Sequence, residues 1–361
     1  MQRALDLAKK GSGFTSPNPL VGAVIVKNNK IIGEGYHEYY GGPHAEINAF
    51  NNAAENVSGA TMYVTLEPCS HFGKTPPCAD AIVERGIRKV VIGLKDPNPV
   101  VSGKGIAILE AAGIEVEVGI LEKEGRILNE IFLKYITTNL PFVIMKTAMT
   151  LDGKIATRTN ASRWITGRES REYVHELRNR VSGIMVGIGT VLADDPSLTT
   201  RLKNSVGRDP ARIIVDSSAR VPLDAKVLNL KSEAKTYIAV TERASREKVS
   251  KLQEKGAEVI TVQSKDERVD LKELMKELGR RNIDSVLLEG GSELNYAALE
   301  AEIVDKVCSF ISPKIIGGCT AKTPVGGEGK ALMEEAINLE YVATHLFGED
   351  IMIEGYIIKE G

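Results

Sequence analysis

The stretch TMYVTLEPCSHFGKTPPCAD, residues 61–80, decides the fold of the first part of this chain. It opens with apolar and β-branched residues over Thr61–Leu66, a composition typical of a buried strand. Cys69 follows this strand closely, and Cys78 comes after eight intervening residues, behind two prolines. Proline is tolerated where a helix begins, because the first amides of a helix lack partners within it. We therefore expect Cys78 in the first turn of a helix, facing Cys69 across the loop.

A histidine and a glutamate upstream complete a set of residues that can bind a metal and move a proton. Pro43-His44-Ala45-Glu46 opens a helical pattern. One imidazole and two thiolates give zinc three protein ligands and leave one position for water, which is the pattern of a catalytic zinc site. Zinc lowers the pKa of that water, and Glu46 is predicted to carry its proton to a leaving nitrogen. The pattern is typical of zinc nucleobase deaminases, although their two cysteines are usually two residues apart.

Periodicity alone does not aim His44 and Glu46 at one point, since residues two apart on a regular helix differ by about 200°. The start of the helix must supply that geometry. Two other interpretations stay open: the cysteines could be unconnected buried thiols, or the zinc site could be structural with His71 as a fourth ligand. Cys308 and Cys319 have no neighbouring histidine or cysteine, and we expect both to pack in the core.

Length and charge limit the classes of protein. A chain of 361 residues predicts two domains. Its 46 basic and 48 acidic side chains nearly cancel, which argues against a protein held to nucleic acid or to a membrane by its overall charge. The apolar runs are far shorter than the ~20 residues of a membrane helix, and the N-terminus does not resemble a signal peptide. We expect a cytoplasmic protein without a disulfide framework.

Strand-like and helical segments alternate in both halves of the chain, which indicates the α/β class. A helical pattern runs from Glu122 to Ile136, and a strand-like segment, Phe142–Met145, follows it. The polar Thr137–Pro141 between them marks a boundary. We therefore predict a first domain over residues 1–140 and a second over residues 141–361.

Motifs of the first domain, taken together, resemble the bifunctional riboflavin-biosynthesis deaminase/reductase family. They are Asn18-Pro19-Leu20-Val21-Gly22-Ala23, His44-Ala45-Glu46, residues 68–78 with the family's own eight-residue loop, and Asp96-Pro97-Asn98-Pro99. The resemblance implies a three-layer cytidine-deaminase-like domain that binds zinc through His44, Cys69 and Cys78, with Glu46 as the catalytic residue. It implies that the phosphorylated pyrimidine substrate is contacted by Asn18, His37, His71, Lys74, Asp96 and Asn98.

The second domain lacks a standard nucleotide-binding motif, and Gly290-Gly291-Ser292 is either a phosphate-binding turn or a plain turn between strand and helix. Segments 146–156, 162–166, 187–198 and 289–291 resemble the family's reductase domain, which has a dihydrofolate-reductase-like α/β fold. The resemblance implies NADPH binding by Ala148, Trp164, Thr190, Asp194, Ser217 and Gly291. It places the sugar phosphate near Ser162, Arg178, Leu198, Arg201 and Glu289, with Lys146 as the catalytic residue beside the reacting sugar carbon.

The residues themselves leave some of these assignments open. Arg178 and Arg201 could each chelate a phosphate or be surface charges, and Trp164, the single tryptophan, would by default pack in a core.

These observations predict a two-step enzyme with one Zn²⁺ per chain and NADPH as cofactors. Zinc hydroxide would deaminate 2,5-diamino-6-(5-phosphoribosylamino)pyrimidin-4(3H)-one, and NADPH would then reduce the ribosyl group of 5-amino-6-(5-phosphoribosylamino)uracil to ribityl. One rival is a zinc deaminase of nucleic acids or free nucleobases with an accessory nucleotide-binding domain, which would need a basic, aromatic-lined groove. Another is a non-enzymatic zinc-stabilised module joined to a nucleotide-sensing domain. The sequence leaves a homo-oligomer open.

Overall fold

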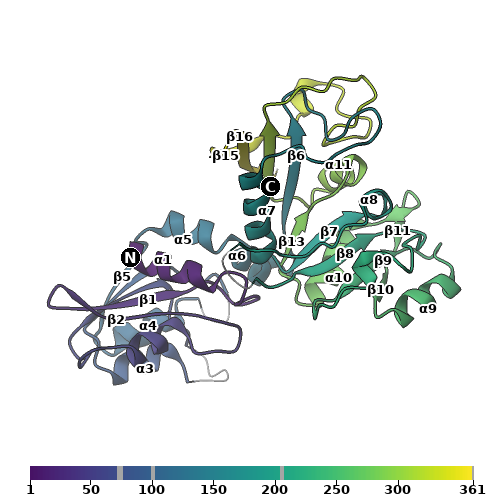
Figure 1. The fold of residues 1–361 in the computed structure, drawn as a ribbon. Coiled ribbons are helices and arrows are strands. Elements are labelled where there is room, and N and C mark those ends of the chain that lie inside the picture. Colours follow the sequence, from purple (N-terminus) through teal and green to yellow (C-terminus); the bar gives the residue numbers. More distant parts are fainter. Residues whose placement is uncertain (71–75, 99–101, 204–206, 360–361) are drawn as a thin grey trace. The chain divides into compact units, whose positions relative to one another are not determined.

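The computed structural model describes residues 1–70, 76–98, 102–203 and 207–359. The chain divides into two compact units, Met1–Asn139 and Leu140–Gly361 (Figure 1). This division lies one residue before the boundary placed from the sequence. Among the described residues, no helix has the length and apolar character needed to cross a membrane. His71 and Lys74, which the family resemblance assigns to substrate binding, lie outside the described ranges.

The first unit is built on a five-stranded sheet in the order β2-β1-β3-β4-β5. Its strands are β1 (Gly22–Lys27), β2 (Lys30–Tyr36), β3 (Thr61–Leu66), β4 (Lys89–Leu94) and β5 (Glu115–Val118). β1 is antiparallel to β2 and β3, whereas β3, β4 and β5 are parallel. Along β1, Ala23 and Ile25 join one buried cluster and Val24 joins another, so both faces of the sheet are covered.

Helices form the outer two layers of this unit. One face carries α2 (Ala45–Asn51), α3 (Cys78–Glu84) and α4 (Lys104–Ala111). The other carries α1 (Gln2–Ala8), which continues into the short η1 (Lys9–Gly11), and α5 (Glu122–Leu128) (Figure 1). The last helix, α6 (Glu130–Thr138), packs Phe132 against Leu66 and Leu94, where β3 and β4 end. The three-layer α/β arrangement predicted for the first domain is confirmed.

The helical pattern over Glu122–Ile136 does not form the single helix expected, because it breaks at Asn129. This side chain is 2% exposed. Its Oδ1 accepts a hydrogen bond from Leu20 N at 2.8 Å, and its Nδ2 donates to Leu20 O at 3.0 Å. Asn129 thereby satisfies both backbone groups of a residue just before β1. That tertiary contact takes precedence over helix continuity, which sequence periodicity alone could not indicate.

The second unit contains a nine-stranded sheet in the order β10-β9-β8-β7-β13-β6-β14-β16-β15. Its strands are β6 (Phe142–Thr150), β7 (Gly183–Gly187), β8 (Ala211–Val215), β9 (Thr236–Val240), β10 (Glu258–Thr261), β13 (Ser285–Leu288), β14 (Lys306–Ser312), β15 (Leu339–Phe347) and β16 (Asp350–Ile357). Neighbouring strands are parallel along the part of this order that runs β10-β9-β8-β7-β13-β6-β14. β16 is antiparallel to β14, and β15 is antiparallel to β16. A separate small hairpin pairs β11 (Ser264–Lys265) with β12 (Arg268–Val269).

The second unit also contains five α-helices and two short 3₁₀ helices in the described part of the chain. They are α7 (Arg168–Arg180), α8 (Ile188–Asp194), α9 (Arg246–Glu254), α10 (Leu271–Arg280), α11 (Ser292–Glu300), η2 (Lys226–Leu228) and η3 (Met333–Glu335). α10 buries a stripe of side chains at helical spacing, Leu271, Leu274, Met275 and Leu278, against the sheet. On the other face, the Tyr173 ring of α7 packs against the rings of Phe310 and Phe347 in tilted arrangements. This packing fixes α7 over the end of the sheet.

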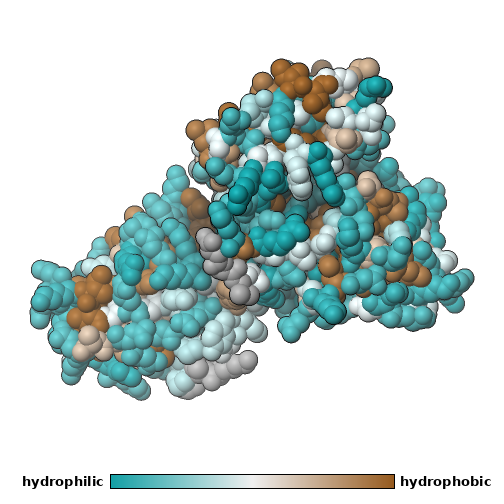
Figure 2. Space-filling model, in the orientation of Figure 1, coloured by the Kyte–Doolittle hydropathy of each residue, from teal (hydrophilic) through white to brown (hydrophobic). Residues whose placement is uncertain are grey.

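Exposed apolar side chains gather in the C-terminal part of the second unit. Ile315 is 74% exposed, Met333 83% and Leu346 76%. Figure 2 shows brown apolar patches at the top of the view, over the segments drawn yellow in Figure 1. Cys308 is buried in β14, as expected, but Cys319 is exposed, and the prediction that it packs in the core was wrong. Cys319 lies in a turn between β14 and β15, beyond the strands that would cover it.

Candidate active sites

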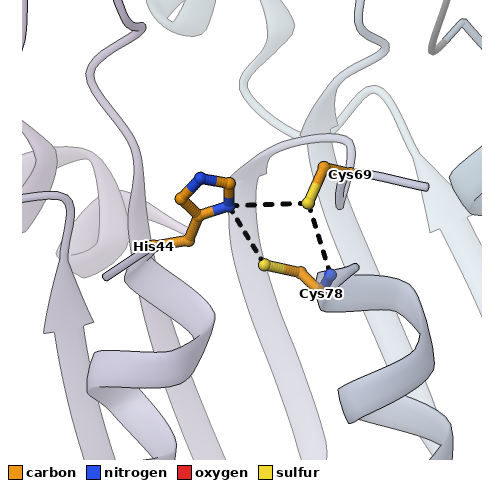
Figure 3. Close-up of side chains that lie close together, drawn as sticks. All are labelled: His44, Cys69 and Cys78. Carbon is orange, nitrogen blue, oxygen red and sulfur yellow. Dashed lines mark hydrogen bonds between the residues drawn. The ribbon is translucent and has the colours of Figure 1, made fainter. Parts of the chain in front are cut away.

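His44, Cys69 and Cys78 lie together in the first unit (Figure 3). His44 directly precedes α2, Cys69 follows β3, and Cys78 is the first residue of α3. Their ligand atoms all lie within 4.8 Å of one another. His44 Nδ1 is 3.2 Å from Cys78 Sγ and 3.5 Å from Cys69 Sγ. The predicted helix start at Cys78 and the predicted approach of the two thiols are confirmed.

These spacings suit a tetrahedral zinc ion. Zinc bonds of about 2.1 Å to nitrogen and about 2.3 Å to sulfur require ligand atoms roughly 3.5 to 4 Å apart. The 3.5 Å between His44 Nδ1 and Cys69 Sγ fits this range, and the 3.2 Å between His44 Nδ1 and Cys78 Sγ is slightly shorter. No further His, Cys, Asp or Glu joins the group within the described ranges. Among the described residues the donor set is therefore one imidazole and two thiols, and three protein ligands are the number that a catalytic zinc site has.

The two thiols differ in their surroundings. Cys69 accepts a hydrogen bond from the Cys78 thiol, and His44 is its second partner, so the pKa of Cys69 is lowered. The backbone N–H of Cys78, at the start of α3, also donates to Cys69 Sγ at 3.3 Å. The dipole at the start of a helix would by itself favour a thiolate at the first residue, here Cys78. The structure instead directs that amide to Cys69, which is the thiol prepared to bind as thiolate.

Glu46 lies in the first turn of α2 and is 3% exposed. Burial raises its pKa to about 7, because a carboxylate loses its hydration there. The Cys78 side chain hydrogen-bonds to it, which places the carboxyl beside the three ligands. His44 has an extended backbone, φ −73° and ψ 162°, so it precedes the helix rather than belonging to it. The helix start thus supplies the geometry that regular periodicity could not.

Asn18 and His37 form a pair next to this group. His37 Nδ1 is 3.0 Å from the carbonyl oxygen of Pro43, and His37 Nε2 is 3.1 Å from Asn18 Nδ2. A carbonyl only accepts, so Nδ1 carries the proton and Nε2 accepts from the Asn18 amide. Burial lowers the pKa of His37, which keeps the ring neutral. The His37 ring also meets the His44 ring edge to face at 5.7 Å between centroids.

Asp96 and Asn98 follow β4 in the sequence. Asp96 Oδ1 accepts a hydrogen bond from Asn98 N at 2.9 Å, which closes a tight turn. Asp96 N donates to Glu67 Oε2 at 3.2 Å. Glu67 was not among the predicted site residues. Its position between a buried strand and a zinc-ligand cysteine was a signal that could have singled it out.

In the second unit, Lys146, Arg178 and Glu289 form a cluster of charges. Arg178 of α7 donates Nε to Glu289 Oε1 at 2.6 Å and Nη2 to Oε2 at 2.8 Å. Burial would raise the pKa of Glu289, but the charges of Arg178 and Lys146 outweigh it and hold the pKa at about 2. Burial lowers the pKa of Lys146 on β6. Its Nζ lies 5.9 Å from the centroid of the Phe310 ring.

The segment that contains Leu198 and Arg201 is held against α7. Arg178 Nη1 donates to Thr199 O at 3.0 Å. Arg201 N donates to Nδ1 of His175, one turn before Arg178, at 3.2 Å. Burial, together with the charges of Arg178 and Arg201, lowers the pKa of His175 to about 4, so this ring is a neutral acceptor. Leu198 is buried and has a left-handed backbone, with φ of 50°. Sequence reasoning missed His175.

The residues expected to bind the cofactor fall into several groups. Thr190, in the first turn of α8, lies near Gly291, the residue before α11: a Cβ built on Gly291 would be 3.8 Å from Thr190 Oγ1. Ala148 pairs with Phe310 across β6 and β14. Ser217 follows β8, and its Oγ accepts from Val269 N at 3.2 Å.

Ser162 and Trp164 belong to the segment before α7, and Trp164 is 65% exposed, so the default core position for this tryptophan was wrong. The Arg171 guanidinium carbon lies 4.6 Å from the centroid of the Trp164 ring. Arg163 Nη2 donates to the carbonyl oxygen of Asp194 at 3.3 Å, which links this segment to the end of α8. The tryptophan therefore stands at the surface, where an arginine stacks on it.

Family models match both units. The RibD C-terminal domain matches residues 141–353, and the cytidine and deoxycytidylate deaminase zinc-binding region matches residues 1–94. Among curated proteins, the riboflavin biosynthesis protein RibD of Actinobacillus pleuropneumoniae is 50% identical over 359 residues, covering 99% of this chain and 95% of that protein. RibD of Aquifex aeolicus is 46% identical over 353 residues, covering 98% of this chain and 96% of that protein.

Solved structures of related proteins match this chain over nearly its whole length. RibD of Acinetobacter baumannii, form 1, has a TM-score of 0.89 at 38% identity and covers 99% of this chain and 98% of that chain. A diaminohydroxyphosphoribosylaminopyrimidine deaminase/5-amino-6-(5-phosphoribosylamino)uracil reductase from Thermotoga maritima has a TM-score of 0.87 at 41% identity. The match covers 99% of this chain and 97% of that chain. The resemblance read from the motifs is confirmed, and so are a zinc-dependent deaminase domain and a dihydrofolate-reductase-like reductase domain. The chain belongs to the RibD family of bifunctional deaminase/reductases of riboflavin biosynthesis.

Proposed function

We propose that the first unit deaminates 2,5-diamino-6-(5-phosphoribosylamino)pyrimidin-4(3H)-one and that the second reduces the ribosyl group of the product, 5-amino-6-(5-phosphoribosylamino)uracil, with NADPH. Membership of the RibD family supports both steps. The observation that carries the proposal is the group of His44, Cys69 and Cys78 with the buried Glu46 beside it. Such a donor set, with a carboxyl that is not a ligand, matches hydrolytic removal of an amino group.

In the deaminase site, each residue has a proposed task. Zinc held by His44 Nδ1 and the two sulfurs would lower the pKa of a water molecule and so supply a nucleophile near neutral pH. The Glu46 carboxylate accepts a proton at an Oε atom and returns it to the leaving nitrogen. Because its pKa is about 7, the group is present in both protonation states near neutral pH, which suits a residue that must accept and then donate.

Recognition of the pyrimidine is assigned to polar groups around Glu46. The Asn18 amide nitrogen is engaged by His37, so the Asn18 oxygen is the atom proposed to face the substrate ring. His37 then contributes by holding that amide in one orientation. Asp96 and Asn98 are proposed to contact the substrate from the turn after β4. His71 and Lys74 stay proposals from the family resemblance, with Lys74 as the cation for the 5′-phosphate.

In the reductase site, the chain supplies a suitable cradle for a dinucleotide. Gly291 precedes α11 without a side-chain cap among the described residues, so backbone N–H groups at this helix start can bind a phosphate. NADPH would supply the hydride when bound. We assign its binding to this turn and to the five other residues that the family motifs indicate: Ala148, Trp164, Thr190, Asp194 and Ser217.

The substrate of the reductase site is proposed to lie beside Lys146. The sugar phosphate is assigned to Ser162, Arg201 and the backbone around Leu198. The donors of Arg178 are engaged by Glu289 and Thr199. Arg178 is therefore proposed to shape this site by holding Glu289 and the 198–201 segment, with less freedom than Arg201 to chelate the phosphate.

One assay tests both steps. The purified protein, with zinc at one per chain, is incubated with the diaminopyrimidinone ribosylamine phosphate while ammonia release is followed, and NADPH is then added while its oxidation is followed. We expect ammonia first and NADPH oxidation only after it. Absence of both activities in zinc-loaded protein would contradict the proposed function.

We also propose that the chain acts in the cytoplasm on free phosphorylated pyrimidines rather than on nucleic acid. The near balance of 46 basic and 48 acidic side chains supports this, since nucleic-acid binding draws on clustered positive charge. The exposed apolar side chains of the C-terminal segment support self-association of the chain. Light scattering of the purified protein would measure that association, and a monomer at micromolar concentration would contradict it.

A further inference from the structure

Glu67 is a buried carboxylate directly after β3, only 4% exposed, and it binds four backbone amides. Its Oε2 accepts hydrogen bonds from Asp96 N at 3.2 Å and Gly103 N at 3.1 Å. Its Oε1 accepts from Gly105 N at 3.0 Å and Ile106 N at 3.3 Å. Such bonds to a charged acceptor are stronger than neutral ones and compensate the cost of burying the charge.

The four donors come from both ends of one connection. Asp96 lies just after β4, whereas Gly103 precedes α4 and Ile106 is in its first turn. One carboxylate therefore fixes where this connection leaves the sheet and where it enters the helix. Asp96 and Asn98, the proposed substrate contacts, stand at the end of the connection that is held through the bond from Asp96 N to Oε2.

A close backbone contact locks the same junction from the other side. A Cβ built on Gly105 would lie 2.0 Å from the carbonyl oxygen of Pro68, so only glycine fits at this position. The first turn of α4 thus rests on the main chain of the residue between Glu67 and the zinc ligand Cys69. Through Glu67 and Pro68, the substrate turn after β4 and the metal-ligand segment after β3 share one rigid support.

A direct chemical role for Glu67 does not fit these contacts. Both oxygens already accept two N–H groups each, so moving a proton on or off this carboxylate would break the bonds that hold the connection. Glu46, in contrast, is the carboxyl beside the three ligand atoms. The contacts of Glu67 suit a residue that positions others.

We propose that Glu67 is a positioning residue of the deaminase site, which sets Asp96 and Asn98 at the distance from the zinc ligands that the pyrimidine requires. The inference rests on the proposed deaminase function. If the turn after β4 shifts, Asp96 and Asn98 lose part of their proposed contact with the pyrimidine, which weakens substrate binding, and the bound ring is also aligned less well with Glu46, which lowers the rate to a smaller extent. The effect of Glu67 should therefore appear mainly in substrate binding.

Two substitutions separate charge from shape. Glu67→Gln keeps the size but points an NH₂ group at two backbone N–H groups, so one pair of hydrogen bonds is lost. Glu67→Asp keeps the carboxylate but shortens the side chain by one methylene, so the four amides are bound at longer distances. Glu110→Gln, at an exposed glutamate of α4, is the matched control for loss of one acidic side chain in this region.

The experiment measures KM and kcat for ammonia release, zinc content, and the rate of NADPH oxidation with the deaminated intermediate, all in the full chain. We expect Glu67→Gln to raise KM by at least about tenfold, with a smaller fall in kcat, and Glu67→Asp to lie between it and the wild type. Zinc content and the reductase rate should match the wild type in both variants. Glu110→Gln should leave all four quantities unchanged.

An unchanged KM in Glu67→Gln would overturn the inference. Loss of zinc in step with the loss of activity would also overturn it, since Glu67 would then serve the metal ligands alone. If Glu67→Gln does not fold, Glu67→Asp decides, and a wild-type KM in that variant overturns the inference. Absence of ammonia release from the zinc-loaded wild type is a different result, which contradicts the proposed function itself.

Discussion

Arg178 and Glu289 form a bidentate ion pair that joins α7 to the end of β13. Nε donates to Oε1 at 2.6 Å, and Nη2 donates to Oε2 at 2.8 Å. Both side chains are largely buried. The remaining nitrogen of the guanidinium, Nη1, donates to the carbonyl oxygen of Thr199. From the sequence alone, Arg178 was a candidate for direct phosphate binding. The phosphate-binding role stays a prediction, and we propose that Arg178 also holds Glu289 and the 198–201 segment in place beside Lys146.

Replacing Arg178 with glutamine should destabilise the second unit by about 3 kcal/mol, because it leaves a buried carboxylate without its partner. Urea unfolding followed by the fluorescence of Trp164, the single tryptophan, measures this loss in the second unit. Arg168→Gln is the control, since Arg168 on the same helix makes an exposed i,i+4 pair with Glu172 and such pairs contribute little. Equal losses in the two variants would contradict the importance of the Arg178–Glu289 pair.

The low pKa of Glu289 predicts a specific pH dependence. A carboxyl whose folded-state pKa lies below its unfolded value stabilises the fold at pH above the unfolded value, and this stabilisation is lost as pH falls toward the folded value. For Glu289 the window runs from 4.5 down to about 2, and the contribution is on the order of 3 kcal/mol. Unfolding of the second unit at a series of pH values should show this decline, and Glu289→Gln should flatten it. Parallel curves for the two proteins would contradict the ion pair's role.

Removal of zinc should abolish ammonia release by the first unit and leave NADPH oxidation by the second unit unchanged. Cys69→Ser removes the ligand that is prepared as a thiolate, so we expect zinc well below one per chain and no ammonia release. Cys319→Ser, at an exposed cysteine of the second unit, should keep both zinc and activity. NADPH oxidation with the deaminated intermediate should be the same in both variants. Full zinc occupancy in Cys69→Ser would show that the metal is held elsewhere.

Asn129→Asp tests the side chain that anchors the segment before β1. The substitution keeps an acceptor for Leu20 N but places a carboxylate oxygen against the Leu20 carbonyl, where the amide had donated. Leaving a buried polar group without its bond costs about 1 to 3 kcal/mol. Thermal unfolding of the first unit, followed by amide exchange within β1, should register this loss. A wild-type unfolding curve would show that the Leu20 contact contributes nothing to stability.

Local patterns predicted much of the fold. β3 begins and ends at the residues expected, Thr61–Leu66, because it is a short run of β-branched and apolar residues next to polar ones. Serine is a favoured residue just before a helix, and Ser245 caps α9 by accepting from Lys248 N. The patterns failed where a distant partner decides, as at Asn129, whose contact with Leu20 no window of neighbouring residues contains.

The zinc site was accessible from the sequence because its chemistry restricts the residue types: few patterns other than a metal site combine His44, two cysteines behind prolines and a glutamate. The supporting contacts were not accessible. Glu67, His175 and the pairing of Arg178 with Glu289 act through backbone amides or through residues more than twenty positions away. Sequence spacing carries no information on such contacts until the fold brings the partners together.

The central claim is that Glu46 moves the proton in the deaminase site and that the two units carry separate reactions. Glu46→Gln, loaded with zinc, is the most direct test, since glutamine keeps the shape but cannot accept and return a proton. We predict one zinc per chain, loss of ammonia release by at least about 1,000-fold, and wild-type NADPH oxidation with the deaminated intermediate. Ammonia release near the wild-type rate from Glu46→Gln would contradict the claim.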